Sequence, residues 1–160
     1  MPIATNCSKF DISEEKKTKL IAKIFAENLN KGCNLFLYGE IGVGKSTFVK
    51  FLINSLQKKN NQPITEVPSP TFNLINEYEI NSIIIQHLDL YRLKNQKELN
   101  NLEILENTLD YIKIIEWPEL LENFKLSNKI NFNFEYGENM QKRYLTISTN
   151  MSLKFLNAIK

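Results

Sequence analysis

The residues of this sequence with the clearest chemical purpose form one short stretch, residues 39–46, which read GEIGVGKS. Their spacing is that of a phosphate-binding P-loop, G-x-x-x-x-G-K-[ST]. A loop that wraps a polyphosphate must turn its backbone N–H groups inward, and glycine permits the backbone angles and the close approach that this requires. Lys45 would reach the β- and γ-phosphates, and the Ser46 hydroxyl would bind Mg²⁺. The stretch therefore predicts a nucleotide site.

The residues on either side of this P-loop support the prediction. Residues 33–38, CNLFLY, form an apolar run of strand length, and residues 48–56, FVKFLINSL, are apolar enough for a helix packed on a sheet. A strand, a glycine loop and a helix in this order are what the motif requires, and the helix adds the positive end of its dipole. The residues expected to contact the nucleotide here are Gly39, Glu40, Ile41, Gly42, Val43, Gly44, Lys45, Ser46 and Thr47.

Two acidic residues follow apolar runs further along the chain. Residues 83–89, IIIQHLD, end in Asp89, which is typical of the carboxylate that holds Mg²⁺ and its waters in P-loop proteins. Residues 111–118, YIKIIEWP, read as a strand stopped by proline and carry Glu116. Glu116 could polarise the attacking water or hold Mg²⁺ through water, and a plain surface carboxylate is the alternative. The predicted metal ligands are Ser46, Asp89 and Glu116.

The composition is that of one globular domain spanning residues 1–160. Apolar residues make up 42% and charged residues 24%, which is ordinary for a soluble protein. The net charge of +2 is too small to imply nucleic-acid or membrane binding by itself. Cys7 and Cys33 lack metal-site spacing, residues 1–10 lack the apolar core of a signal peptide, and no apolar run has the length of a membrane span. We expect a cytoplasmic protein with reduced thiols.

Helical spacing precedes the P-loop. Residues 11–14, DISE, are typical of a helix start in which a capping side chain is followed three residues later by Glu14. Gly32 can end this helix. Its apolar residues are Leu20, Ile21, Ile24, Phe25 and Leu29. Short helices are also expected between residues 93 and 110, over residues 119–124 and near the C-terminus, with a surface loop at residues 57–62.

The predicted fold class is α/β, a single P-loop NTPase domain with three layers (α/β/α) around a mixed sheet. The parallel core of the sheet is expected at residues 33–38, 83–89 and 112–117. Antiparallel strands are expected at residues 72–80, 129–136 and 143–149. Apolar and polar residues alternate over residues 129–136, as in a half-buried antiparallel edge strand. The bound nucleotide should lie at the carboxyl ends of the parallel strands.

Three further stretches stand out beside the P-loop: SPTF at residues 69–72, HLDLYR at residues 87–92 and EWPE at residues 116–119. In this order the four stretches resemble the bacterial TsaE family, also called YjeE, whose members carry a P-loop, S-P-T-[FY], H-x-D-L-Y-R and E-W-P-[EQ]. The resemblance runs from about Asp11 to Ile147. Each short motif is common, whereas the ordered set is specific to the family.

The resemblance implies a small P-loop ATPase that serves the synthesis of N6-threonylcarbamoyladenosine in tRNA, with ATP and Mg²⁺ as cofactors. Its implied partner is the TsaB–TsaD complex, which transfers the threonylcarbamoyl group and which the ATP cycle would reset between turnovers. tRNA would be reached only through that complex. Two departures are small: Ser46 stands where Thr is usual, and Ile41 stands where Leu is common. Neither conflicts with ATP binding.

The resemblance also implies roles for single residues. Thr71 would lie in a switch-I-like segment near the γ-phosphate and Mg²⁺, with a proline-bounded start of a strand as the alternative. Asp89 matches the Mg²⁺-site acid of the family. Trp117 matches a tryptophan near the nucleotide, although it could equally belong to the core. We expect catalysis to depend on Glu116, Lys45 and Thr71.

Three residues of the HLDLYR stretch keep open roles. A lone histidine in a strand, such as His87, is more often structural than catalytic. Tyr91 and Arg92 could bind the partner or steady the switch-like segment, and Arg92 could also contact phosphate.

Two other functions use the same P-loop. A small-molecule kinase usually closes an arginine-bearing lid over the transferred phosphate, and this chain has only Arg92 and Arg143. A nucleotide-sensing module would bind without hydrolysis. The low net charge and the lack of arginine clusters argue against a strong autonomous RNA site.

Overall fold

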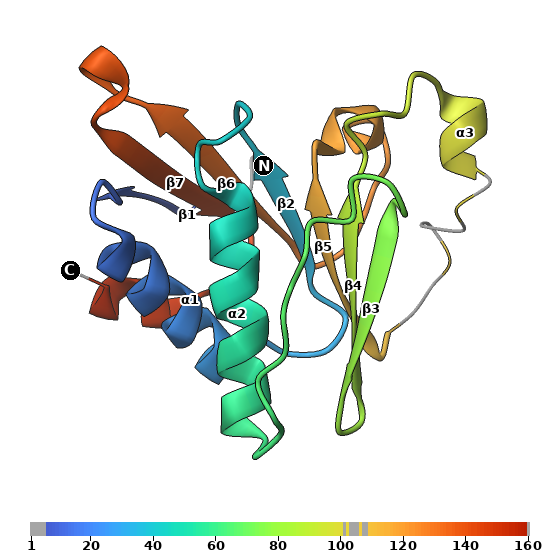
Figure 1. Ribbon diagram of the computed structural model, residues 1–160, viewed down its shortest axis with the longest axis horizontal. Coiled ribbons are helices and arrows are strands. Elements are labelled where there is room, and N and C mark those ends of the chain that lie inside the picture. Colours follow the sequence, from blue (N-terminus) through green and yellow to red (C-terminus); the bar gives the residue numbers. More distant parts are fainter. Residues whose placement is uncertain (1–5, 101, 103–105, 107–108, 160) are drawn as a thin grey trace.

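One mixed sheet of seven strands organises the part of the chain that the computed structural model describes, residues 6–100, 102, 106 and 109–159 (Figure 1). Its strands are β1 (Asn6–Asp11), β2 (Asn34–Tyr38), β3 (Ile75–Ile80), β4 (Ile83–Asp89), β5 (Tyr111–Glu116), β6 (Lys129–Tyr136) and β7 (Arg143–Thr149). Their order is β1-β7-β6-β2-β5-β4-β3. The four central strands, β6, β2, β5 and β4, are parallel, and β1, β7 and β3 join by antiparallel pairing. The predicted α/β class with a mixed, parallel-cored sheet is confirmed.

Strand β6 differs from the expectation of an antiparallel edge. It lies inside the sheet, parallel to β2 on one side and antiparallel to β7 on the other. Its alternation arises because Phe132 and its apolar neighbours enter the core, whereas Asn133 and Glu135 on the other face are exposed. Alternation reports a sheet with one solvated face, and it carries no information on the direction of the neighbouring strand.

Strand β1 and the start of the first helix also differ from expectation. No strand was predicted at residues 6–11, which pair with β7 so that Phe10 lies opposite Leu145. The predicted capping box is wrong: α1 (Glu15–Asn28) has Glu14 at its N-cap without a side-chain cap hydrogen bond. Asp11 instead accepts hydrogen bonds from the backbone N–H (2.9 Å) and the hydroxyl of Ser13, because it ends a strand and turns the chain there.

Helices α1 and α2 (Lys45–Lys59) lie side by side on one face of the sheet (Figure 1). The ring centroids of Phe25 in α1 and Phe48 in α2 each lie 5.0 Å from the ring centroid of Phe132 in β6. Both helices therefore pack against the parallel strands through this phenylalanine. Helix α2 runs to Lys59, so the predicted loop begins three residues later than expected. Leu20, predicted on the apolar side of α1, is 45% exposed. None of the helices that the structure describes has the length and apolar character to cross a membrane.

Over β2, β4 and β5 the opposite face is covered by short segments: α3 (Gln96–Asn100) and the 3₁₀ helix η1 (Pro118–Leu121). Leu99 and Leu121 from these segments pack with Phe36, Leu88 and Ile115 of the central strands. The third layer is therefore short helical turns, and 3₁₀ turns η2 (Glu138–Met140) and η3 (Lys154–Ala158) follow later in the chain. Of the apolar residues predicted to build helices between residues 93 and 110, Ile104 and Leu105 lie outside the described residues.

Strand β3 is shorter than predicted, because residues 71–73 form a turn. Leu74 has a positive φ of 66°, and its N–H donates to the carbonyl of Pro70 at 2.7 Å. Phe72 is 82% exposed. This turn returns the chain alongside the end of β4 and brings Thr71 toward Asp89.

Candidate functional site

The P-loop (residues 39–46) connects the end of β2 to the start of α2, as its motif requires. Gly39 has a φ of +142°, and a Cβ there would lie 2.6 Å from the backbone oxygen of Phe134 in β6. The Tyr136 hydroxyl, at the end of the same strand, donates to the carbonyl of Ile41 at 3.4 Å. The parallel neighbour β6 therefore supports the loop from outside, and only glycine fits at its first position.

Lys45 is folded into the loop. Its side chain is 5% exposed, and its Nζ donates to the carbonyls of Gly39 and Glu40, the latter at 2.9 Å. The same amine lies 4.4 Å from the ring centroid of Trp117. Burial lowers the pKa of Lys45, and the nearby carboxylates of Glu116 and Asp89 oppose that lowering. The amine is thus a buried cation beside two acids, held by neutral oxygens and an aromatic face.

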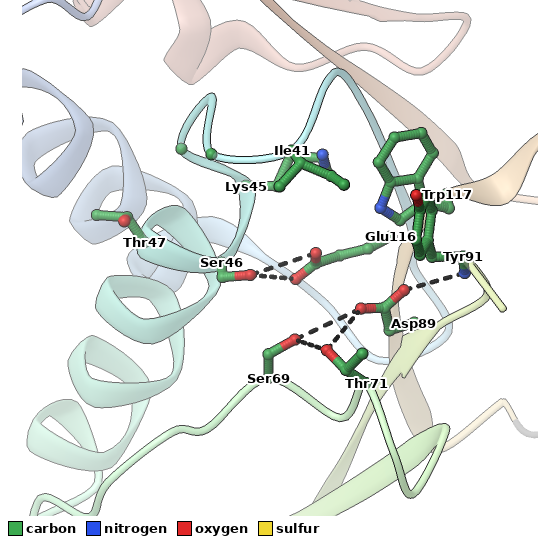
Figure 2. A pocket seen from close by; sticks show the side chains of 12 residues that line it. Ile41, Lys45, Ser46, Thr47, Ser69, Thr71, Asp89, Tyr91, Glu116 and Trp117 are labelled. Carbon is green, nitrogen blue, oxygen red and sulfur yellow. Dashed lines mark hydrogen bonds between the residues drawn. The ribbon is translucent and has the colours of Figure 1, made fainter.

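Glu116 ends β5 and is 3% exposed. The Ser46 hydroxyl donates to its Oε1 at 3.1 Å and to its Oε2 at 3.3 Å (Figure 2). The imidazole Nε2 of His87, a residue of β4, lies 2.9 Å from Glu116 Oε1. Glu116 is therefore a buried carboxylate in direct contact with the P-loop serine.

Asp89 ends β4 and is 5% exposed. In the sheet register it lies opposite Glu116, because the parallel strands β4 and β5 end together. Its Oδ1 accepts from the backbone N–H of Tyr91 at 3.0 Å, and its Oδ2 accepts from the hydroxyls of Ser69 and Thr71, both at 3.4 Å (Figure 2). The segment before β3 is thereby tied to the acid at the end of β4.

Trp117 follows Glu116 in the left-handed region, with φ 56° and ψ 56°. Its ring lies 4.7 Å from the ring of Tyr91 and faces the Lys45 amine on the P-loop (Figure 2). Trp117 lines the cavity and also packs, partly buried, against the core cluster that contains Phe36. Both readings of this tryptophan from sequence, a place at the nucleotide site or in the core, therefore have a counterpart in the structure. A backbone strained in this way at a site is consistent with a functional placement of the side chain.

These groups surround one cavity of about 290 Å³ at the carboxyl ends of the parallel strands (Figure 2). It is lined by Ile41, Gly42, Gly44, Lys45, Ser46, Thr47, Ser69, Thr71, Asp89, Tyr91, Glu116 and Trp117. The predicted residues outside the lining are Gly39 and Glu40, whose carbonyls hold Lys45, and Val43, which is buried in the core. Ser69 and Tyr91 were not predicted as site residues, although both belong to stretches that the sequence singled out.

Comparison with known proteins decides the family. The family model described as "Threonylcarbamoyl adenosine biosynthesis protein TsaE" matches residues 12–145. The chain belongs to the TsaE family. The resemblance drawn from the four short stretches is thereby confirmed, and with it membership of a family involved in the biosynthesis of threonylcarbamoyladenosine in tRNA.

Several TsaE proteins are similar to this chain over most of their length. The tRNA threonylcarbamoyladenosine biosynthesis protein TsaE of Rickettsia conorii is 34% identical over 139 residues, which cover 87% of this chain and 77% of the relative. The protein of the same name from Nostoc sp. is 35% identical over 158 residues, covering 96% and 93%. The crystal structure of Bacillus subtilis YdiB superposes with a TM-score of 0.69 at 24% identity, covering 92% of this chain and 88% of that one, so it shares the fold.

Proposed function

We propose that this protein binds Mg·ATP in the cavity beside the P-loop and hydrolyses it. The observation that carries the proposal is the convergence of Lys45, Ser46, Thr71, Asp89 and Glu116 on that one cavity from four separate parts of the chain. A buried cation, two hydroxyls and two carboxylates are the groups that P-loop enzymes use to hold a nucleoside triphosphate and its metal. The choice of ATP rests on the resemblance to the TsaE family.

The donor set fits a magnesium ion. Mg²⁺ prefers oxygen ligands, and nucleotide sites hold it with one or two carboxylates together with phosphate oxygens and waters. Ser46 Oγ and the Asp89 carboxylate would hold the ion, and the Glu116 carboxylate would hold it through water. When bound, the ion would neutralise the charge that develops on the β- and γ-phosphates. The Ser46 hydroxyl can still donate to Glu116 in that state, because a hydroxyl has a proton and two lone pairs.

The protein side chains divide the remaining tasks. Lys45 would exchange the carbonyls of Gly39 and Glu40 for phosphate oxygens, which attract an ammonium more strongly than neutral carbonyls do. Thr71, linked to Asp89, would approach the γ-phosphate side of the cavity. Glu116 would orient and polarise the water that attacks the γ-phosphorus, while the bond from that phosphorus to the bridging oxygen breaks.

The biological setting follows the family. We infer an accessory subunit needed for the threonylcarbamoyladenosine modification of tRNA, which acts on the TsaB–TsaD complex between its turnovers. The net charge of +2 gives the chain little general attraction for nucleic acid, so tRNA would be contacted through the complex. Weak hydrolysis by the isolated chain and faster hydrolysis in the complex are the expected behaviour.

ATP hydrolysis measured with and without the TsaB–TsaD pair tests this proposal. The proposal expects phosphate release that depends on Mg²⁺, rises when the pair is added, and disappears in Lys45→Ala. Tight Mg·ATP binding without phosphate release in either sample would instead support a nucleotide sensor. Transfer of the γ-phosphate to a nucleoside or another small acceptor would support a kinase.

A further inference from the structure

His87 is a buried polar residue without a role in the proposed chemistry. It lies on β4, two residues before Asp89, and its side chain is 1% exposed. Its ring nitrogen Nε2 lies 2.9 Å from Glu116 Oε1. Its other ring nitrogen, Nδ1, is buried and has no hydrogen-bond partner among the described residues. Burying a ring nitrogen without a hydrogen-bond partner costs free energy that an apolar side chain at this position would avoid. The hydrogen bond to Glu116 is the interaction that histidine makes here and an apolar residue could not.

The chemistry of the two groups fixes the direction of this bond. The Glu116 carboxylate accepts hydrogen bonds, and Ser46 already donates to both of its oxygens. Nε2 of His87 must therefore carry a proton and donate it to Oε1, which leaves Nδ1 as the unpartnered atom. Oε1 thus accepts from two donors, one from β4 and one from α2.

The sheet register explains why His87 reaches Glu116. On the parallel strands β4 and β5, Asp89 lies opposite Glu116 and His87 lies opposite Ile114. Residues two apart on a strand point to the same face of the sheet, so His87 lies on the same face as Asp89 and Glu116. It lies two residues further from the end of the strand, where the cavity is. Glu116 lines the cavity and His87 does not, so the imidazole holds the glutamate from outside the cavity.

We propose that His87 is a positioning residue that holds the Glu116 carboxylate against Ser46 and toward the cavity. The inference rests on the proposed ATP hydrolysis, in which Glu116 orients the attacking water. A glutamate side chain has several rotatable bonds, and Ser46, the other donor to this carboxylate, is itself exposed. The second donor, from a rigid strand, restricts it to the conformation that the structure shows.

Two amide substitutions form a matched test. In His87→Gln the amide nitrogen stands the same number of bonds from Cα as Nε2, so it can donate to Glu116. In His87→Asn the amide nitrogen corresponds to Nδ1 and falls short of Glu116. We expect His87→Gln to keep kcat within about threefold of wild type and His87→Asn to lose about tenfold or more, as for other residues that orient a catalytic group, with KM for ATP little changed.

A spectroscopic measurement tests the hydrogen bond itself. His87 is the only histidine in the chain, so a ¹⁵N–¹H spectrum of imidazole nitrogens contains a single ring. We expect a protonated, slowly exchanging Nε2 and an unprotonated Nδ1, with a shifted and faster-exchanging Nε2 proton in Glu116→Gln. A proton on Nδ1 alone would overturn the inference.

The outcomes separate the two proposals. Loss of turnover in His87→Asn with retention in His87→Gln, at equal thermal stability of both variants, supports the positioning role. Equal turnover in both variants and in wild type would overturn the role of His87 and leave the proposed ATPase standing. No turnover in wild type with the TsaB–TsaD pair would overturn the proposed ATPase and the positioning role together.

Discussion

Alanine at two P-loop glycines should have clearly different effects on stability. Gly39 and Gly44 both have a positive φ, +142° and +124°, so alanine at either position strains the backbone by about 1–3 kcal/mol. At Gly39 the new Cβ would also meet the backbone oxygen of Phe134 at 2.6 Å and the Val43 side chain at 2.9 Å, whereas at Gly44 nothing lies within 4 Å. Overpacking of this kind adds about 1–3 kcal/mol, because a backbone oxygen cannot rotate away.

Thermal and urea unfolding of the two variants measure this difference. In a domain of this length, 1 kcal/mol corresponds to about 2–4 °C in Tm, so Gly39→Ala should melt about 2–12 °C below Gly44→Ala. The effect of an added methyl group on the unfolded chain is the same in both variants and cancels. Equal melting temperatures would show that a Cβ at Gly39 does not clash with the backbone of β6. The close packing of Phe134 against the P-loop would then be refuted.

Three further predictions concern Glu116, Tyr38 and Trp117. Glu116→Ala should lower ATP turnover in the presence of TsaB–TsaD by about 100-fold or more, the usual contribution of a general base, while calorimetry finds Mg·ATP affinity within about tenfold of wild type; unchanged turnover would exclude Glu116 from catalysis. Burial, together with Glu122 and Glu119, raises the pKa of Tyr38 to about 12. The unfolded chain loses this proton near pH 10, so wild type should lose more stability than Tyr38→Phe as pH rises from about 10 to about 12; equal losses in Tm would contradict the burial. Mg·ATP should change the fluorescence emission of Trp117, the only tryptophan in the sequence, because the Lys45 amine moves away from its ring. Lys45→Ala should show no such change. The same emission change in the variant would show that the Trp117 signal does not depend on the Lys45 amine.

The P-loop and the acids that face it could be predicted because their signals are local. Residues 39–46 carry their geometry in their own glycines, and Asp89 and Glu116 each end an apolar run. Once the strands are taken as parallel, their carboxyl ends must meet, which places both acids at one edge of the sheet. The sequence therefore predicted most of the residues that surround the cavity, but it missed Ser69 and Tyr91 and gave no distance between any two of them.

The contacts that depend on long-range pairing could not be predicted in this way. The parallel direction of β6 is set by its neighbour β2, ninety-odd residues earlier in the chain, and not by its own alternation. Strand β1 was missed because residues 6–11 contain only two apolar side chains, Cys7 and Phe10, which are too few for a strand pattern. The strand forms by pairing with β7, which lies far away in the sequence. The bond from His87 to Glu116 depends on the register of β4 against β5, which no local motif encodes.

Isothermal titration of Mg·ATP into the wild-type protein and into Lys45→Ala tests the central claim most directly. Binding by the P-loop predicts a saturable heat for one site in wild type, which weakens when Mg²⁺ is removed and is at least about tenfold weaker in Lys45→Ala, where a charge-assisted contact to phosphate is lost. No heat in the wild-type protein, or the same binding curve in the variant, would contradict the account.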